Sequence, residues 1–445
     1  MKKDMTAGRE WSTVLAFSLP IMGANLLQVL YNFADSVIVG NFISSTALGA
    51  VGLTSSMTWL LVAFCSALGS GTNIAAAQFY GAKKEKEIKE TAAASYLMAA
   101  ALSVVLTLAC FLLARPVIEG FLQAPEEMRA DSRTYFLIYS CGIIFQLLYN
   151  VTYGILRAHG DSRGALIFLL ISAVLNVVLD CVFIVIFHMG VAGAAIATVI
   201  AQAGSAVASM IYLWRLFPDL IPSPKYLYAW KEQTALLTRL SVPIILQTTV
   251  TSLGFILLQR LINSFGTPSI EGYSAMLKIE QLAHIPSQSF NVAISSFAGQ
   301  NIGAGQLARA KKGYRSTVLM GVLISICISA AVIFFDEELL GLFNITGESL
   351  RRGREHLDLL MLFIWVNTIM NITCGFLQGA GDVKLPATSS FINLGVRLAL
   401  SYLFAATAIG FRSYYVSMPP AWVLACTIVV LRYRSGKWEN YRLVK

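Results

Sequence analysis

Residues 19–53 read LPIMGANLLQVLYNFADSVIVGNFISSTALGAVGL, an apolar stretch that holds one charged residue, Asp35. About 20 mostly apolar residues cross the roughly 30 Å hydrocarbon core of a bilayer as a helix, because a helix satisfies its own backbone polar groups. A carboxylate at the centre of such a helix costs about 2.5–3.5 kcal/mol on insertion scales, and it usually faces a cavity, an ion path or a partner. We therefore expect a membrane helix in which Asp35 has a functional role.

The composition of the whole chain is that of an integral membrane protein. The chain has 445 residues, of which 56% are hydrophobic and 13% are charged, and its mean hydropathy is +0.68. Soluble domains carry about 25% charged residues. We therefore predict an all-α membrane protein, and the length criterion marks twelve spans. Their expected bounds are 13–39, 46–70, 91–114, 134–156, 164–188, 190–214, 239–264, 272–297, 314–335, 356–378, 387–409 and 411–431.

The Lys and Arg residues between the spans predict the orientation of the chain. With the N-terminus inside, 23 of the 33 lie in cytoplasmic segments and 7 in outer segments. Cytoplasmic loops carry this excess, so we expect a multi-pass protein of the cell membrane with both termini in the cytoplasm. We expect the first span to be retained, because it is too long for a signal-peptide core and no small-residue cleavage site follows it. The net charge of +9 then favours anionic lipid headgroups as partners and not nucleic acid.

The reactive side chains argue against an enzyme. The seven Cys residues fall in or at the ends of spans without metal-ligand spacing, and the four His residues are isolated. No phosphate-binding loop is present for direct use of ATP, and no nucleophile with a base or metal pair occurs at membrane depth. We expect free thiols, no cofactor, and no bound metal other than a coupling ion.

An internal repeat divides the chain into two lobes. The polar stretch 215–238 is the expected cytoplasmic linker between an N-lobe of residues 1–214 and a C-lobe of residues 239–445. Each lobe contains six predicted spans, so the lobes have the same orientation and are expected to be related by a pseudo-twofold axis along the membrane normal, around a central cleft. The matched residues are Pro20 with Pro243, at an offset of 223; Gln78 with Gln300 and Gly81 with Gly303, at 222; and Asn150 with Asn371, Gly154 with Gly375, Gly160 with Gly381 and Asp161 with Asp382, at 221. Such repeats are typical of secondary transporters that alternate access.

The repeat does not extend to the membrane carboxylates. Asp35 aligns with Leu258, and Asp180 aligns with Ser401. Both intramembrane aspartates therefore belong to the N-lobe, and neither can be a symmetric feature of the scaffold.

Asp35 and Asp180 have polar neighbours at a similar predicted depth. Asn176 and Asp180 are four residues apart and share a helix face, and Thr198 lies at a matching depth in the next span. Burial makes a carboxylate bind a proton more tightly, and a second carboxylate nearby strengthens this effect. The same oxygen atoms could hold a dehydrated Na⁺, so the pattern predicts a site for H⁺ or Na⁺. The alternative is a polar network that only holds helices together.

The C-lobe is also polar, but in a different pattern. The span 272–297 carries too many polar residues to face lipid on all sides, and Glu280 and His284 are better spaced for a pair than Lys278 and Glu280. We interpret these groups either as substrate-facing or as helix-to-helix hydrogen-bonding groups. The candidates for the substrate cleft are Gln247, Thr251, Lys278, Glu280, Gln288, Asn291, Asn367, Asn371 and, in the N-lobe, Asn150.

The chain resembles the multidrug and toxic compound extrusion (MATE) family, and more closely its DinF-like branch. The resemblance rests on LPIMGANLLQVLYNFADSVIVG, GILRAHGDSRGAL, LNVVLDCVFIVIFHMGVAGAAIATVIAQ and SSFAGQNIGAGQLARAKKG, in this order and spacing. It implies a V-shaped, twelve-helix antiporter, expected as a monomer, that exports organic and often cationic compounds in exchange for H⁺ or Na⁺.

The resemblance also carries residue roles. The cation site of that family matches Asp35, Asn176, Asp180 and Thr198 here. Its NorM-like branch has acidic residues in spans seven and ten, where this chain has Thr251 and Asn367, so no second carboxylate site of that kind is expected. 

The nearest alternative function is that of a flippase for lipid-linked precursors. A flippase would be expected to line its cleft with basic residues for anionic headgroups. The spans here contain few basic residues beyond Arg260, Lys278 and Arg397, which favours the exporter.

Overall fold

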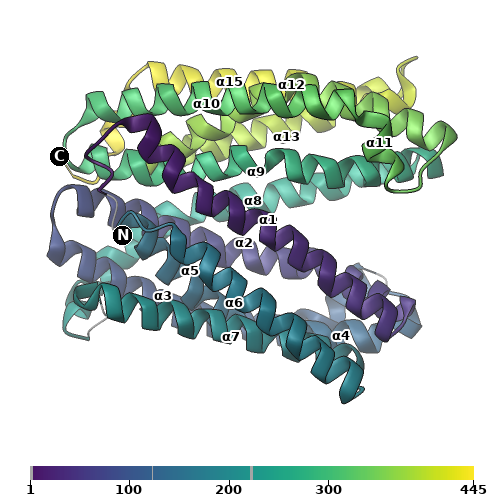
Figure 1. Ribbon diagram of the computed structural model, residues 1–445, viewed down its shortest axis with the longest axis horizontal. Helices are drawn as coiled ribbons and strands as arrows, with labels where there is room; N and C mark the ends of the chain where they lie inside the picture. Colours follow the sequence, from purple (N-terminus) through teal and green to yellow (C-terminus); the bar gives the residue numbers. More distant parts are fainter. Residues whose placement is uncertain (1–3, 123, 221–223, 445) are drawn as a thin grey trace. The chain divides into compact units, whose positions relative to one another are not determined.

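The computed structural model describes residues 4–122, 124–220 and 224–444 (Figure 1). These residues form helices and connecting turns, and no strand occurs among them. Within these ranges, the description does not extend to the side chains of Phe33, Ala34, Asp35, Ser36, Val37, Gly40, Asn41, Ser45, Leu48, Ser56, Phe121, Ala165, Asp219 and Pro224.

Each of the twelve predicted spans coincides with a long helix or with a helical segment that is bent or changes its pitch. These are α1 (Glu10–Phe42), α2 (Ser45–Gly81), α3 (Glu85–Arg115), α4 with α5 (Glu126–Cys141 and Ile143–Ala158), α6 with η2 (Arg163–Asp180 and Cys181–Ile186), α7 (Gly190–Leu216), α8 (Trp230–Asn263), α9 (Thr267–Gly303), α10 (Leu307–Phe334), α12 (Gly347–Gly379), α13 (Lys384–Ala405) and α14 with α15 (Ser413–Val416 and Met418–Arg434). The short elements are η1 (Pro116–Phe121), η3 (Pro218–Leu220), η4 (Pro224–Ala229), α11 (Asp336–Gly341), η5 (Gly410–Arg412) and η6 (Lys437–Tyr441).

Most of these helices are apolar enough to cross a membrane unaided. Over the described residues, nine helices meet this criterion by length and composition, and the pair α4–α5, bent by 44°, makes a tenth. The remaining two, α9 and α13, are long enough but carry Lys278, Glu280 and Arg397 within them. The all-helical, twelve-span class predicted from sequence is therefore confirmed.

Several helices extend well beyond the predicted spans. The span 46–70 continues as α2 to Gly81, and α8 begins at Trp230, inside the stretch expected to be linker. A helix can continue past the hydrocarbon because its backbone hydrogen bonds do not depend on the surrounding solvent. The start of α8 is also held by packing, since Leu237 and Leu240 are 0% and 1% exposed. Hydropathy located the apolar part of each helix and missed its polar extensions.

Contacts within the chain group the residues into two compact units. Unit 1 comprises Met1–Asp4 and Gly23–Ile245, and unit 2 comprises Met5–Met22 and Leu246–Lys445. The first part of α1 thus belongs to unit 2, and the first part of α8 belongs to unit 1. Both divisions fall two residues after a proline, Pro20 or Pro243, where the helix loses a backbone hydrogen bond. The lobe bounds expected from sequence remain a prediction.

Each unit contains a pair of helices whose backbones approach each other closely at a glycine. In unit 1, a Cβ atom added to Gly154 of α5 would lie 2.3 Å from the carbonyl oxygen of Gly69 in α2. In unit 2, a Cβ atom on Gly375 of α12 would lie 2.3 Å from the carbonyl oxygen of Asn291 in α9. Gly154 and Gly375 are partners in the sequence repeat, so the repeat preserves a helix contact that only glycine permits.

The segment before α1 is docked on unit 2. The side chain of Met5 is 0% exposed and shares a buried cluster with Phe297 and Trp438. Its backbone N–H donates to Gln300 Oε1 at 3.2 Å, and its carbonyl oxygen accepts from Asn301 Nδ2 at 3.1 Å. The N-terminal and C-terminal parts of unit 2 therefore lie close together, since Met5 and Trp438 share one buried cluster. Which side of the membrane this end faces remains a prediction.

Candidate functional site

The polar cluster of unit 1 forms where α6 changes its helical pitch. Asp180 is the last residue of α6, and the π-helical turn η2 begins at Cys181. Asn176, Asp180 and Thr198 are 0%, 0% and 6% exposed, and α6 packs directly on α7, which carries Thr198. A π-helical turn is rare and often occurs at functional sites, because it displaces the side chains around it. Sequence periodicity did not predict this turn.

The amide of Asn176 lies between Asp180 and α7. Its Nδ2 donates to Asp180 Oδ2 at 2.8 Å, and its oxygen accepts from the backbone N–H of Thr198 at 3.3 Å. Thr198 itself donates to the carbonyl oxygen of Ala194 at 3.0 Å.

Asp35 is the fourth predicted member of the cluster. It lies in the helical backbone of α1, but its side chain falls outside the described residues. Its place beside Asp180 therefore remains a prediction. The three members that the structure describes offer carboxylate, amide and hydroxyl oxygens, the ligand types that suit a proton or a hard cation.

Two of the predicted cleft candidates bond to a neighbouring helix. Gln247 of α8 donates to Ser390 Oγ of α13 at 2.8 Å. Asn291 of α9 donates to the carbonyl oxygen of Asn371 in α12 at 2.7 Å. These bonds support the helix-to-helix alternative for the two amides.

Other candidates bond within their own helix. Asn371 donates to Asn367 Oδ1 at 2.6 Å, Thr251 donates to the carbonyl oxygen of Gln247, and Asn150 donates to the carbonyl oxygen of Gln146. Such bonds satisfy polar groups in an apolar surrounding. By contrast, Lys278 and Gln288 are exposed. The Glu280–His284 pair that spacing favoured is formed, with 3.4 Å between Oε1 and Nε2.

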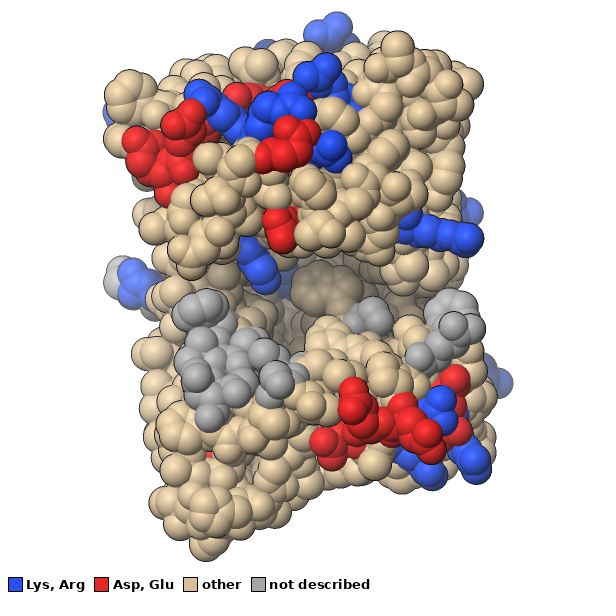
Figure 2. Space-filling view, turned by 90° about the vertical axis from the view of Figure 1, so that its right-hand side faces the viewer, with Lys and Arg blue, Asp and Glu red and all other residues tan. Residues whose placement is uncertain are grey.

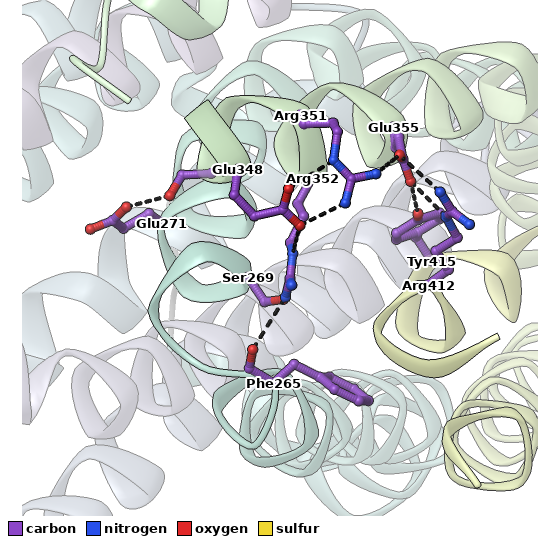
Figure 3. Close-up of polar contacts among 10 residues, drawn as sticks. Phe265, Ser269, Glu271, Glu348, Arg351, Arg352, Glu355, Arg412 and Tyr415 are labelled. Carbon is purple, nitrogen blue, oxygen red and sulfur yellow. Dashed lines mark hydrogen bonds and ion pairs between the residues drawn. The ribbon is translucent and has the colours of Figure 1, made fainter. Parts of the chain in front are cut away.

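A charged network at the beginning of α12 was not predicted from sequence. Arg351 donates to both Glu348 and Glu355, and Glu355 also accepts from Arg412 and from the hydroxyl of Tyr415, at 2.6–2.8 Å (Figure 3). This network ties α12 to η5 and α14 within unit 2. Figure 2 views the molecule from the end at which α12 begins, and it shows acidic and basic side chains gathered on a mostly uncharged surface.

Arg352 extends the network to α9. It donates to Glu348, to Ser269 Oγ at 2.7 Å and to the carbonyl oxygen of Phe265 at 3.2 Å (Figure 3). Its guanidinium also lies 4.1 Å from the ring centroid of Phe411. Charges four residues apart along GESLRRGRE could have predicted the pairs within α12. The partners on other elements are distant in sequence, so this spacing does not indicate them.

Comparison with known proteins decides the family. The MatE family model matches residues 20–182 and 243–403. This chain belongs to the MatE family. The two matched stretches begin at Pro20 and Pro243, 223 residues apart, and end 221 residues apart, which are the offsets of the internal repeat. The MATE family predicted from sequence is therefore confirmed.

Curated relatives of this MatE-family chain match it over nearly its whole length. The "Probable multidrug resistance protein YpnP" of Bacillus subtilis is 30% identical over 447 residues, covering 99% of this chain and 98% of that protein. The "Probable multidrug resistance protein NorM" of Thermotoga maritima is 25% identical, with 96% and 93% covered.

A solved structure gives the same fold. The outward-facing conformation of a multidrug resistance MATE family transporter of the MOP superfamily superposes with a TM-score of 0.87, at 22% identity and with 98% of each chain covered. The fold of this chain is therefore that of the MATE transporters.

Proposed function

We propose that this protein is a secondary antiporter that exports small organic compounds, often cationic, in exchange for H⁺ or Na⁺ by alternating access. The observation that carries the proposal is Asp180, a fully buried carboxylate that accepts from Asn176, which in turn bonds to Thr198 of the neighbouring helix. A buried ionisable group in a membrane helix is a functional site by default. The multidrug names of the relatives support the substrate class.

Asn176 connects Asp180 to α7, because its Nδ2 donates to Asp180 Oδ2 and its amide oxygen accepts from the backbone N–H of Thr198. An ionised Asp180 accepts this bond, whereas a proton on Oδ2 makes that oxygen a donor. Ion binding at Asp180 thus changes its bond to Asn176. Coupling then requires only that the ion and the substrate favour opposite conformations.

The proposal is tested with purified protein in proteoliposomes. The Asp180→Asn variant keeps the shape of the side chain but cannot exchange a proton or carry charge, so gradient-driven efflux of a fluorescent organic cation is expected to fall at least tenfold. Glu119→Gln is the matched control, because it also removes one carboxylate from unit 1 but lies in η1 and pairs with the exposed Arg115. Gradient-driven efflux by Asp180→Asn equal to that of the control would refute the assignment.

The driving ion is identified by imposing a pH gradient and a Na⁺ gradient separately. Efflux that follows only the pH gradient assigns H⁺, and efflux that follows only the Na⁺ gradient assigns Na⁺. A monodisperse elution profile shows that each variant is folded. If wild-type protein responds to neither gradient, the antiporter proposal is wrong.

A further inference from the structure

Unit 1 contains a cavity that the proposed transport function does not use. Its volume is about 150 Å³, and it lies where α2, α5 and α7 end and α3 begins. Two of its lining residues, Lys89 and Leu216, are two residues outside the predicted spans 91–114 and 190–214. At about 1.5 Å per residue, this is the depth of the lipid headgroups. A cavity of this volume admits a group of about six to eight non-hydrogen atoms.

Two opposite charges on the wall of the cavity have no partner. Glu85 and Lys89 of α3 are four residues apart, in the order that favours an ion pair along a helix. Within the part of the chain that the structure describes, neither side chain makes an ion pair or a hydrogen bond, whereas the neighbouring Lys84 and Glu87 pair at 3.7 Å. The cavity therefore presents a carboxylate and an ammonium that are both available to a ligand.

Aromatic rings form another wall of the cavity. The centroid of the His159 ring lies 4.5 Å from that of Tyr80 and 5.5 Å from that of Phe217, and all three residues line the cavity. Tyr80 also interacts electrostatically with Asp4. Aromatic rings attract a cation, and the attraction is larger where water is excluded. This wall therefore favours the positive end of a ligand.

Exposed apolar side chains of α7 continue from the cavity into the predicted span 190–214. Leu216 lines the cavity, and Ile211 and Trp214 precede it; all three are exposed. In a membrane helix such side chains face lipid, and Trp is enriched at the level of the headgroups. The acyl chains of a phospholipid therefore find an apolar surface on α7 when its headgroup enters the cavity.

We propose that this cavity binds a ligand whose polar end carries a primary ammonium and a phosphate, the chemistry of a phosphatidylethanolamine headgroup. Lys89 binds the phosphate, and Glu85 binds the ammonium beside the aromatic wall. A lipid with a phosphate but no ammonium leaves Glu85 unpaired and repelled by the phosphate, so the same two charges discriminate between lipids. The site is separate from the Asp180 cluster and does not depend on the transport reaction.

The test is native mass spectrometry of the full-length protein, purified in detergent. Phosphatidylethanolamine and phosphatidylglycerol with the same acyl chains are added in equal amounts, and wild-type protein is expected to retain more of the first. Glu85→Gln should lower the retention of phosphatidylethanolamine about fivefold, the effect of one charge near a headgroup, and leave that of phosphatidylglycerol unchanged. Lys89→Met should lower the retention of both lipids.

Glu87→Gln and Lys84→Met are the matched controls. They remove the same charges from the first turn of α3, but these two residues pair with each other and do not line the cavity. Both controls should retain the lipids as wild type does, and a monodisperse elution profile shows that each variant is folded. Equal retention of the two lipids by wild type would overturn the proposal, as would retention by Glu85→Gln or Lys89→Met equal to that of its control.

A soluble competitor distinguishes a lipid from a free headgroup. Glycerophosphoethanolamine has the same ammonium and phosphate but no acyl chains. If it displaces phosphatidylethanolamine from wild-type protein, the headgroup chemistry alone is sufficient for binding. If the lipid is retained, with the dependence on Glu85 and Lys89 described above, the site takes the headgroup only as part of a lipid whose acyl chains contact α7.

Discussion

Arg309 of α10 bonds to three carbonyl oxygens of the N-terminal arm, Met5–Gly8, which docks on unit 2. Arg309 donates to the carbonyl oxygens of Ala7 and Gly8 at 2.7 Å each, and more weakly to that of Met5 at 3.2 and 3.4 Å. Its side chain is 15% exposed. We predict that Arg309→Gln releases the arm and leaves the rest of unit 2 folded.

The magnitude follows from the docking contacts. Ordering four backbone residues costs about 4–8 kcal/mol. Burial of the Met5 side chain contributes about 1.5–3 kcal/mol. The bond that the Met5 N–H donates to Gln300 and the bond that Asn301 donates to the Met5 carbonyl contribute about 1 kcal/mol each. The two short bonds from Arg309 contribute about 3–6 kcal/mol together, because their donor is charged. The docked arm is therefore favoured by only about 3 kcal/mol, which is less than or comparable to the contribution of Arg309.

Hydrogen exchange at the Met5 amide measures this balance directly. A free energy of about 3 kcal/mol corresponds to protection of roughly a hundredfold, and in Arg309→Gln the protection should disappear. Arg434→Gln, an exposed position on α15, is the charge-matched control and should keep the protection. Unchanged protection in Arg309→Gln would refute the reasoning, since the arm would then be held by contacts other than those of Arg309.

Two further predictions concern stability, measured as the thermal midpoint and the free energy of unfolding in detergent. Gly375→Ala should destabilise the protein by about 2–3 kcal/mol, because its Cβ would lie 2.3 Å from the Asn291 carbonyl oxygen. In the control Gly395→Ala of α13, the added Cβ meets no described atom within 4 Å, so this change should be neutral or stabilising by up to about 1 kcal/mol. Equal effects of the two changes would show that α9 and α12 can move apart freely. Arg432 Nε lies 2.7 Å from the carboxylate of Asp382, whose side chain is 1% exposed. Arg432→Met should lower the free energy of unfolding by about 3–5 kcal/mol, because it leaves Asp382 as an unpaired buried charge. A decrease below about 1 kcal/mol would mean that solvent reaches this carboxylate.

Hydropathy predicted the number and order of the spans but not where the helices end. A span is recognised by its apolar residues, so the extension of α2 to Gly81 and the early start of α8 at Trp230 were not foreseen. Among the described residues, nine single helices are long and apolar enough to be candidate membrane spans, and a bent pair of helices makes a tenth. The polar helices α9 and α13 were predicted by the same length criterion as the other spans, which tolerated Lys278, Glu280 and Arg397 within them.

The candidate site was predicted in outline because its members are spaced by helical geometry. Asn176 and Asp180 are four residues apart, and Thr198 was placed at the same depth by counting residues along adjacent spans; the structure brings all three together. The role of these residues as a cation site remains a prediction, as does the place of the Asp35 side chain. The π-helical turn after Asp180 has no signature in the pattern of apolar residues.

The sequence by itself determined the twelve helices, the internal repeat and the spacing of polar residues along each helix. These properties depend on local chemistry, because transfer of a span into lipid and the i, i+4 geometry involve residues close together in the chain. Only the tertiary structure decided that Arg309 holds the N-terminal arm, that Arg352 reaches the start of α9, and that His356 lies beside Glu280. These partners are separated by tens to hundreds of residues, and they meet only because close packing of the helices brings distant faces into contact.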